Sequence, residues 1–377
     1  MSDLTSTSTA DNNTLSLENA RAIVRKHSDS GDKVVVTVEE IKRYGFSYTA
    51  GFKVYVVDLE SKDKKSHSSC FISIATSPEN KSNEDYHTNN LHIVHSLLAT
   101  VRSKTEIPIN DSILDTSQDI ISFPYLLSPP SPFASSDIIS LREAKQQGHL
   151  SPQDTLLVDL LLGRFLAQLH TNVQNDWYGI PTPPTAPPTD PSYSWQETFT
   201  LLFETLLGQV QELGYTDLPY GEMQRHMSRA IAFFLFDDVE VPSLIWLTGS
   251  EDDIYISLPS HPGTKPPSIA AIIPSLSHAL WGDPLLETLF MDLKSAPAVL
   301  EGYKGSGGGP LLSFPRQKTK RIWYTIFLAL LVLSESGSSA EGGSGGDALS
   351  AERAENKAWA RKTIVENAEL LKDSPCY

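Results

Sequence analysis

The chain of 377 residues is 40% hydrophobic and carries a formal net charge of −16 at pH 7. That length and apolar content are enough to bury the core of one large domain or two. The acidic balance opposes binding to nucleic acid or to anionic membranes, whose phosphates would repel the protein. Two cysteines, Cys70 and Cys376, exclude a disulfide framework and a CxxC metal site, and this usage favours a reducing, cytoplasmic location.

The first part of the chain is predicted to be rich in strands. Residues 1–14 are polar and lack the basic start and apolar run of a secretion signal, so we expect a disordered tail. Residues 15–130 are expected to form a small lobe, which the proline-rich stretch 128–132 joins stiffly to the rest of the chain. Within this lobe, apolar periodicity predicts helices over 17–27 and 89–103, and strands over 34–38, 52–59, 70–75 and 120–127.

Residues 131–377 are predicted to form a larger, mainly helical lobe. The helix expected over 151–170 opens with a Ser-Pro pair, which suits the N-cap and the first helical position. The apolar run 322–333 is shorter than the roughly 20 residues needed to span a bilayer, so we expect a buried helix there. Residues 334–350, rich in Gly and Ser, are expected to be a disordered insertion. Other helices are predicted over 194–213, 219–236, 318–333 and 351–371.

The stretch 242–287 is the most informative part of the sequence. It contains three short apolar runs between turn signals, a pattern typical of buried strands. An acidic triplet at 251–253 lies between the first two runs, and the sequence WGDPLLE closes the stretch at 281–287. The three strands are expected over 244–246, 254–256 and 269–273.

This arrangement resembles the aminoglycoside phosphotransferase and choline kinase superfamily, and looks most like its filamentous-fungal members. In that superfamily the first strand enters a catalytic loop of pattern H-G-D-x-x-x-x-N, the third ends in I-I-D, and W-G-D-P-L-x-E follows in many members. The helix end at 163–170 is also similar to the family's L-G-x-x-L-A-x-L-H. The resemblance implies an α+β, two-lobed protein-kinase-like fold, with a small β-rich N-terminal lobe and a larger helical C-terminal lobe.

The resemblance also places unexpected residues at the family's reactive positions. Trp246 stands where the loop histidine would be, and Thr248 where the catalytic aspartate would be. Asp253 takes the position of the metal-binding asparagine, and Pro274 that of the second metal-binding aspartate. Ser73 or a neighbour lies where the phosphate-binding lysine is expected.

These residues lack most of the chemistry that phosphoryl transfer requires. Thr248 cannot act as a general base, because the pKa of a hydroxyl lies far above neutral, and Pro274 offers no side-chain oxygen. Asp253 could hold a metal ion, but one carboxylate alone is not enough. The carboxylates that are candidates to line the cleft are Glu251, Asp252, Asp253 and Asp283.

Several other features are better explained by structure than by function. The glycines of the 44–51 turn suit ordinary turn geometry, and are only a weak sign of a phosphate cradle. His92 and His95 have a workable spacing for metal ligands but lack further ligands nearby. His170, at the end of a helix, is expected to cap it. Asp283 precedes a proline, which is typical of a turn.

The leading hypothesis is a catalytically degenerate phosphotransferase-like protein, a pseudokinase that binds a small molecule or a protein partner in the interlobe cleft, with no cofactor expected. A second hypothesis is a repurposed enzyme that acts on a secondary-metabolite intermediate, with the 251–253 acids and Thr248 as acid/base groups. A third is a small-molecule kinase with displaced motifs, which would need ATP and Mg²⁺.

Overall fold

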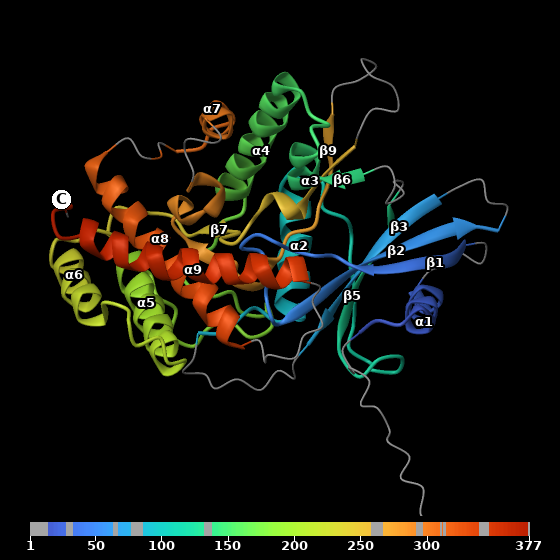
Figure 1. The fold of residues 1–377 in the computed structure, drawn as a ribbon, viewed down its shortest axis with the longest axis horizontal. Helices are drawn as coiled ribbons and strands as arrows, with labels where there is room; N and C mark the ends of the chain where they lie inside the picture. The colour runs from blue at the N-terminus through green and yellow to red at the C-terminus, as the bar shows by residue number, and fades with distance from the viewer. Residues whose placement is uncertain are drawn as a thin grey trace, which may run out of the picture.

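A computed structural model describes residues 14–27, 33–62, 67–76, 86–131, 138–257, 267–291, 297–309, 311, 314–338 and 347–375. These residues form two lobes, one built on a β-sheet and one mainly helical (Figure 1). The α+β, two-lobed architecture expected from the sequence is therefore confirmed. In the described parts of the chain, no helix is both long and apolar enough to cross a bilayer.

The N-terminal lobe is a five-stranded antiparallel sheet with the strand order β1-β2-β3-β5-β4. Along β3, alternate side chains face opposite sides of the sheet, as strand geometry requires. Ile72 and Ile74 join a small core under α1, whereas Phe71 approaches Tyr255 of the other lobe, with ring centroids 6.1 Å apart. The elements of this lobe are α1 (Leu17–His27), β1 (Lys33–Glu40), β2 (Phe52–Ser61), β3 (His67–Ala75), α2 (Leu91–Lys104), β4 (Ile113–Asp115) and β5 (Tyr125–Ser131).

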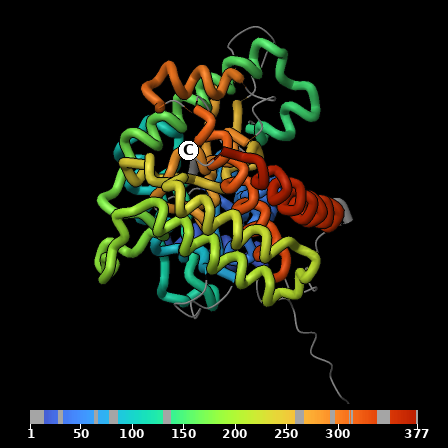
Figure 2. The backbone as a smooth tube through the Cα atoms, turned by 90° about the vertical axis from the view of Figure 1, so that its left-hand side faces the viewer, coloured from blue at the N-terminus to red at the C-terminus, as the bar shows by residue number. Residues whose placement is uncertain are grey.

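The C-terminal lobe packs helices around a three-stranded sheet, β6-β8-β9, and a two-stranded pair, β10-β7. In Figures 1 and 2, α9 lies on the outside of this lobe, and its N-terminal end reaches the boundary with the β lobe. The strands are β6 (Ile138–Ser140), β7 (Ser243–Ile245), β8 (Ile254–Ser257), β9 (Ser268–Ile272) and β10 (Leu280–Gly282). The helices are α3 (Leu141–Gln146), α4 (Pro152–Asn172), α5 (Trp195–Glu212), α6 (Tyr220–Ala232), α7 (Pro297–Gly305), α8 (Pro315–Ser338) and α9 (Asp347–Leu370), with 3-10 turns η2 (Glu251–Asp253), η3 (Leu276–His278), η4 (Pro284–Leu286) and η5 (Thr288–Phe290).

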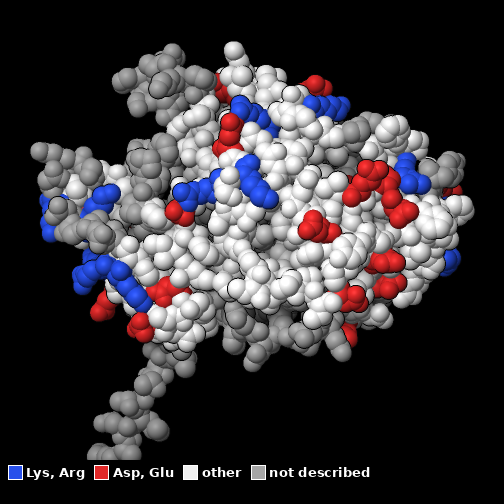
Figure 3. Space-filling view, turned by 180° about the vertical axis from the view of Figure 1, so that it is seen from behind, with Lys and Arg blue, Asp and Glu red and all other residues white. Residues whose placement is uncertain are grey.

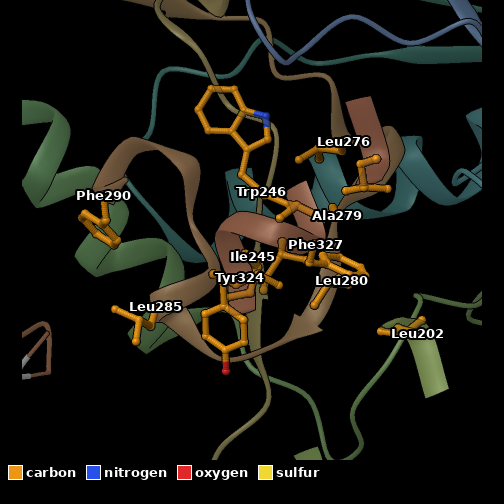
Figure 4. Packing of buried hydrophobic residues seen from close by; sticks show 14 of the residues in the cluster. Leu202, Ile245, Trp246, Leu276, Ala279, Leu280, Leu285, Phe290, Tyr324 and Phe327 are labelled. Atoms are coloured by element: carbon orange, nitrogen blue, oxygen red, sulfur yellow. The ribbon is translucent and has the colours of Figure 1, made fainter. Parts of the chain in front are cut away.

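A large apolar core fills the helical lobe and continues to the boundary between the lobes. Its centre is aromatic: Phe199 of α5 packs against Tyr324 and Phe327 of α8, with ring centroids 5.0 and 5.5 Å away. Figure 4 shows Tyr324 and Phe327 near the β7 and β10 residues Ile245 and Leu280. The strand pair that leads into the 246–253 loop therefore packs against the buried face of α8, which gives that loop a rigid base.

Close helix packing explains the glycine in the 163–170 motif. A Cβ on Gly163 would lie 2.0 Å from the backbone oxygen of Val299 in α7, and one on Gly302 would lie 2.1 Å from that of Leu160. Because only glycine allows the two helices to approach this closely, the motif serves the α4–α7 contact.

The structure differs from the expected elements mainly at short segments and at boundaries. The strands β4, β6 and β10 have three residues each, too few to show a period, and α3 and α7 were also not predicted. β5 begins at Tyr125 rather than at residue 120. Residues 334–338 and 347–350 belong to α8 and α9 rather than to a disordered insertion. The remaining insertion residues, 339–346, and residues 1–13 of the expected tail lie outside the described residues.

Candidate functional site

The two lobes meet where the 44–51 turn, between β1 and β2, lies against the 246–253 loop. The backbone N–H groups of Tyr44 and Gly45 donate to Oδ2 of Asp252, with N···O distances of 2.9 and 2.7 Å. A Cβ on Gly45 would lie 2.9 Å from Cβ of Ser250, so glycine is required for this close approach. The turn is thus docked onto the loop that resembles a catalytic loop.

Asp253 is fully buried and has partners for both carboxylate oxygens. Its Oδ1 accepts a hydrogen bond from Nε of Arg43 at 2.8 Å, and its Oδ2 accepts one from the backbone of Ser250 at 3.1 Å. Arg43 is itself buried and also donates to the backbone oxygen of Ile273 at 3.0 Å. Burial raises the pKa of Asp253 to about 6, and the nearby Arg43 partly opposes that rise. At neutral pH the carboxylate is charged, and a protein guanidinium supplies its counterion.

The other two acids of the triplet are paired with cations of α3. Nη1 of Arg142 lies 3.5 Å from Oδ2 of Asp252, which already accepts the two turn N–H groups. Nζ of Lys145 lies 2.6 Å from Oε1 of Glu251. Burial lowers the pKa of Lys145, but the hydrogen bonds and charges of Glu251 and Asp159 outweigh it, so the pKa is raised. Each acid of the triplet therefore lies within ion-pair distance of a cation, and two of these cations are shared: Arg142 also pairs with Glu352 at 2.6 Å, and Lys145 with Asp159 at 3.4 Å.

Helix α9 covers the outer side of the turn. The ring of Trp359 lies 4.7 Å from that of Phe46, between centroids. The guanidinium carbon of Arg353 lies 3.9 Å above the ring of Tyr48, a cation–π contact. Nδ2 of Asn356 donates to the backbone oxygen of Tyr44 at 3.0 Å. Through these contacts α9 fixes the turn in its position against the 246–253 loop.

Helix α8 fixes the far end of the turn through Glu335. Its Oε2 accepts a hydrogen bond from the backbone N–H of Ala50 at 2.6 Å, and its Oε1 lies 3.1 Å from Nε2 of His278. His278 is buried and stacks on Tyr86, with centroids 5.9 Å apart. The turn is therefore attached to the loop, to α8 and to α9.

Little space remains in the cleft beneath the turn. The cavity lined by Arg43, Gly45, Thr248 and Arg353 leaves about 30 Å³ for the centres of water molecules, room for about two waters. Sites for drug-sized ligands are typically about 300–1,000 Å³. Thr248 lines this cavity, and its buried hydroxyl has no hydrogen-bond partner among the described residues. A nucleotide is much larger than this cavity and does not fit in it unless the turn moves.

Trp246 and Pro274 face away from the turn, into apolar surroundings. Both line a small apolar cavity with Phe165 of α4 and Leu276 of η3. Figure 4 shows Trp246 among the buried side chains of the core. The backbone N–H of Trp246 donates to Oε1 of Glu287 at 2.6 Å, which fixes the start of the loop. Neither side chain offers an oxygen ligand for a metal ion.

Ser73 lies in β3, between Val54 of β2 and Leu126 of β5 in the sheet register. It shares a sheet face with Phe71, which contacts the other lobe, so the residue at the expected lysine position is turned towards the cleft. Its side chain carries no charge. A cation for nucleotide phosphates is therefore not supplied from this position.

Asp283 does not belong to the cleft, contrary to our expectation. Its carboxylate caps η4 by accepting from the N–H of Leu285 at 2.9 Å, and it pairs with Lys320 at 2.7 Å and with the hydroxyl of Tyr324 at 2.8 Å. The Asp-Pro turn places this side chain under α8, which explains the difference. Glu287, at the end of the same motif, supports the loop from below.

The histidines singled out in the sequence, His92, His95 and His170, do not form a metal or catalytic site in the part of the chain that the structure describes. His170 is buried between the hydroxyl of Tyr303 at 3.0 Å and Oε1 of Glu287 at 3.3 Å. His95 pairs with Ser112 at 2.9 Å, and His92 is exposed. The described residues contain no group of three or more His, Cys, Asp or Glu that could hold a metal ion.

The arrangement does not fit a Mg²⁺–nucleotide, the cofactor that the third hypothesis requires. Asp253, the candidate metal ligand predicted from the sequence, is paired with Arg43, and the turn N–H groups that could reach a phosphate donate to Asp252. Uncharged groups occupy the expected base and lysine positions, Thr248 and Ser73. Among the described residues, the site therefore lacks free ligands for the metal ion, free donors for the phosphates, and a base to accept the proton.

The basic residues of this site, Arg43, Arg142 and Lys145, were not predicted from the sequence. They are close to the triplet in space but 106 to 210 positions away from it along the chain. The signal that could have found them is the charge balance: three consecutive acids in a loop between buried strands need nearby cations.

Comparison with known proteins gives the fold. No family model matches the sequence, and no curated protein sequence matches it. Solved structures that are similar include a provisionally assigned aminoglycoside phosphotransferase from Ralstonia eutropha (TM-score 0.57, 12% identity, 96% of this chain and 100% of that chain) and a choline/ethanolamine kinase family protein from Mesorhizobium loti (TM-score 0.50, 10% identity, 94% and 99%). The chain therefore has the kinase-like fold shared by aminoglycoside phosphotransferases and choline/ethanolamine kinases.

Proposed function

We propose that the protein is a pseudokinase: it keeps the kinase-like fold but does not bind Mg²⁺–ATP productively or transfer phosphate. The observation that carries the proposal is the pairing of Glu251, Asp252 and Asp253 with Lys145, Arg142 and Arg43. A metal ion would have to displace a buried guanidinium from Asp253, the carboxylate at the expected metal-binding position. Such displacement leaves a buried charge without its partner and is strongly unfavourable.

The missing general base supports the same conclusion. Thr248 stands at that position, and its hydroxyl has no partner among the described residues that could activate it as a base. Losses of several catalytic groups that act as a unit are not compensated by the one that remains.

The closed cleft favours a protein partner over a small molecule. The cavity beneath the turn holds about two waters, so a small ligand must first lift the turn from its contacts with the loop, α8 and α9. A protein partner can instead bind the outer surface of the closed form. Figure 3 shows Asp and Glu side chains gathered towards the helical end of one face, which would suit a basic partner there.

Acid/base chemistry by a repurposed enzyme is not favoured by the geometry. A general acid or base must lie within hydrogen-bond reach of the substrate. Asp252 and Asp253 are buried and bound by other protein groups. Glu251, the more exposed acid, is held by Lys145.

A phosphotransfer assay tests the proposal. The purified chain is incubated with labelled ATP, Mg²⁺ or Mn²⁺, and a panel of amino alcohols and aminoglycosides, with the Asp253→Ala variant as the matched control. We expect neither protein to transfer label from ATP to any acceptor above the buffer background. Turnover by the wild type that Asp253→Ala abolishes would overturn the proposal.

A further inference from the structure

The contact between the turn and Asp252 has the form of a bound anion. Two consecutive backbone N–H groups, of Tyr44 and Gly45, converge on a single oxygen of this carboxylate, and Arg142 approaches the same oxygen at 3.5 Å. Consecutive N–H groups that point at one atom form an anion-binding concavity. Asp252, which supplies this anion, belongs to the other lobe and lies more than 200 positions from the turn along the chain.

We propose that the 44–51 turn is an oxyanion-binding site whose resident ligand is the carboxylate of Asp252. This inference rests on the proposed function and adds the reason why the cleft stays closed. Any external oxyanion, including a nucleotide phosphate, must compete for these donors with a carboxylate that is permanently tethered beside them. Tethering gives such an internal ligand a high effective concentration.

Charge and burial support the assignment. The carboxylate of Asp252 is buried, and the guanidinium groups of Arg43 and Arg142 both lie at this lobe boundary. If the carboxylate were absent, the two turn N–H groups would lose their acceptor in a poorly hydrated place, which is costly. Arg142 would keep its other partner, Glu352, whose Oε1 lies 2.6 Å from its Nη2. The donors therefore require an oxyanion rather than a cation or a neutral apolar group.

The chemical class of the site follows from its donors. Two N–H groups and a guanidinium suit a carboxylate or a phosphate, since both present oxygens that share a negative charge. Formate has the same heavy atoms as the carboxylate that Asp252 contributes, so it is the smallest probe that can replace it. Inorganic phosphate probes whether the turn also accepts a larger oxyanion.

The test is chemical rescue of Asp252→Ala. Melting temperatures are measured in sodium formate, sodium phosphate and sodium chloride at equal ionic strength, without nucleotide or Mg²⁺. We expect formate or phosphate to raise the Tm of Asp252→Ala by about 2 °C relative to chloride at roughly ten times its Kd. The wild type, whose own carboxylate fills the site, should show no such anion-specific rise.

Three variants make the result specific. Asp252→Asn keeps an oxygen for the turn N–H groups and should not respond to formate. Glu251→Ala loses an equal charge at the neighbouring, more exposed acid and should not respond either. Adding Arg142→Gln to Asp252→Ala should weaken the formate response at least about threefold, because a charge-assisted hydrogen bond is lost.

The inference is overturned if Asp252→Ala responds to formate and phosphate no more than to chloride. Should this variant fail to fold in chloride, the same comparison is made on its refolding yield: a higher yield in formate supports the site, and equal yields overturn it. A negative result leaves the pseudokinase proposal standing, because that proposal is tested separately by phosphate transfer.

Discussion

Replacing Arg43 by Met should destabilise the protein through the charge left on Asp253. Removing one partner of a buried ion pair typically costs about 3–5 kcal/mol, because the other charge stays buried without compensation. With ~2.1 cal/mol/K of unfolding entropy per residue over 377 residues, this corresponds to a fall in Tm of about 4–6 °C. The neighbouring Lys42 is exposed, so Lys42→Met loses the same charge and should change the Tm by less than about 1 °C.

The stability lost in Arg43→Met should be larger at high pH than at low pH. Burial raises the pKa of Asp253 to about 6, above its value of 3.8 in the unfolded chain, and Arg43 opposes this rise. A raised carboxyl pKa means that the folded state binds the proton more tightly, so the contribution of this group to stability is present at low pH and declines as the pH rises from about 4 to 6. Without Arg43 the pKa rises further, and the decline becomes deeper and extends to higher pH.

The assay is therefore thermal and urea unfolding of the wild type, Arg43→Met and Lys42→Met at pH 5 and pH 8. We expect the difference between wild type and Arg43→Met to be larger at pH 8, where the unpaired Asp253 must ionise. The double variant Arg43→Met/Asp253→Asn should recover most of the loss, because it removes the uncompensated charge. An equal loss at both pH values, or a double variant no more stable than Arg43→Met, would refute the reasoning.

Two further predictions concern the loop and the helix that covers the turn. Thr248→Val should leave stability unchanged or raise it by up to about 1 kcal/mol, because the buried hydroxyl it removes has no partner among the described residues. Thr288→Val is the contrast: its hydroxyl lies 2.6 and 2.9 Å from two backbone oxygens, to either of which it can donate its one proton, so urea unfolding should show a loss of about 1–2 kcal/mol. Trp359→Ala should speed hydrogen exchange of the 44–51 turn whereas Trp359→Phe should largely preserve its protection, and equal protection in both variants would show that α9 does not hold the turn.

The sequence predicted those parts of the fold that have a clear period or a clear cap. The helix that begins at Pro152 has Ser151 as its N-cap in a capping box with Asp154. In β2, burial alternates from Tyr55 to Leu59, whereas the apolar run of β3 is buried on both faces of the sheet. The elements that were missed, such as β4 and β10, are three-residue strands that exist only because a partner strand lies beside them. Their formation depends on tertiary contacts, which a local pattern does not contain.

The candidate site could be located from the sequence but not completed. The resemblance pointed to the loop that holds Thr248 and Asp253, and the structure places this loop at the lobe boundary. The partners of the loop come from the turn and from α3, and nothing in the local sequence of these segments specifies that contact. Asp283 was misplaced for the opposite reason: its motif was recognised, but the buried Lys320 that binds it lies on a distant helix.

The most direct test of the account is a calorimetric titration of the folded protein with ATP in the presence of Mg²⁺. Because the turn, Asp252 and Arg43 already occupy the groups that would hold a nucleotide and its metal, we expect no binding tighter than a Kd of about 1 mM, with or without Mg²⁺. Binding at micromolar concentrations that requires Mg²⁺ and is lost in Asp253→Ala would contradict the account.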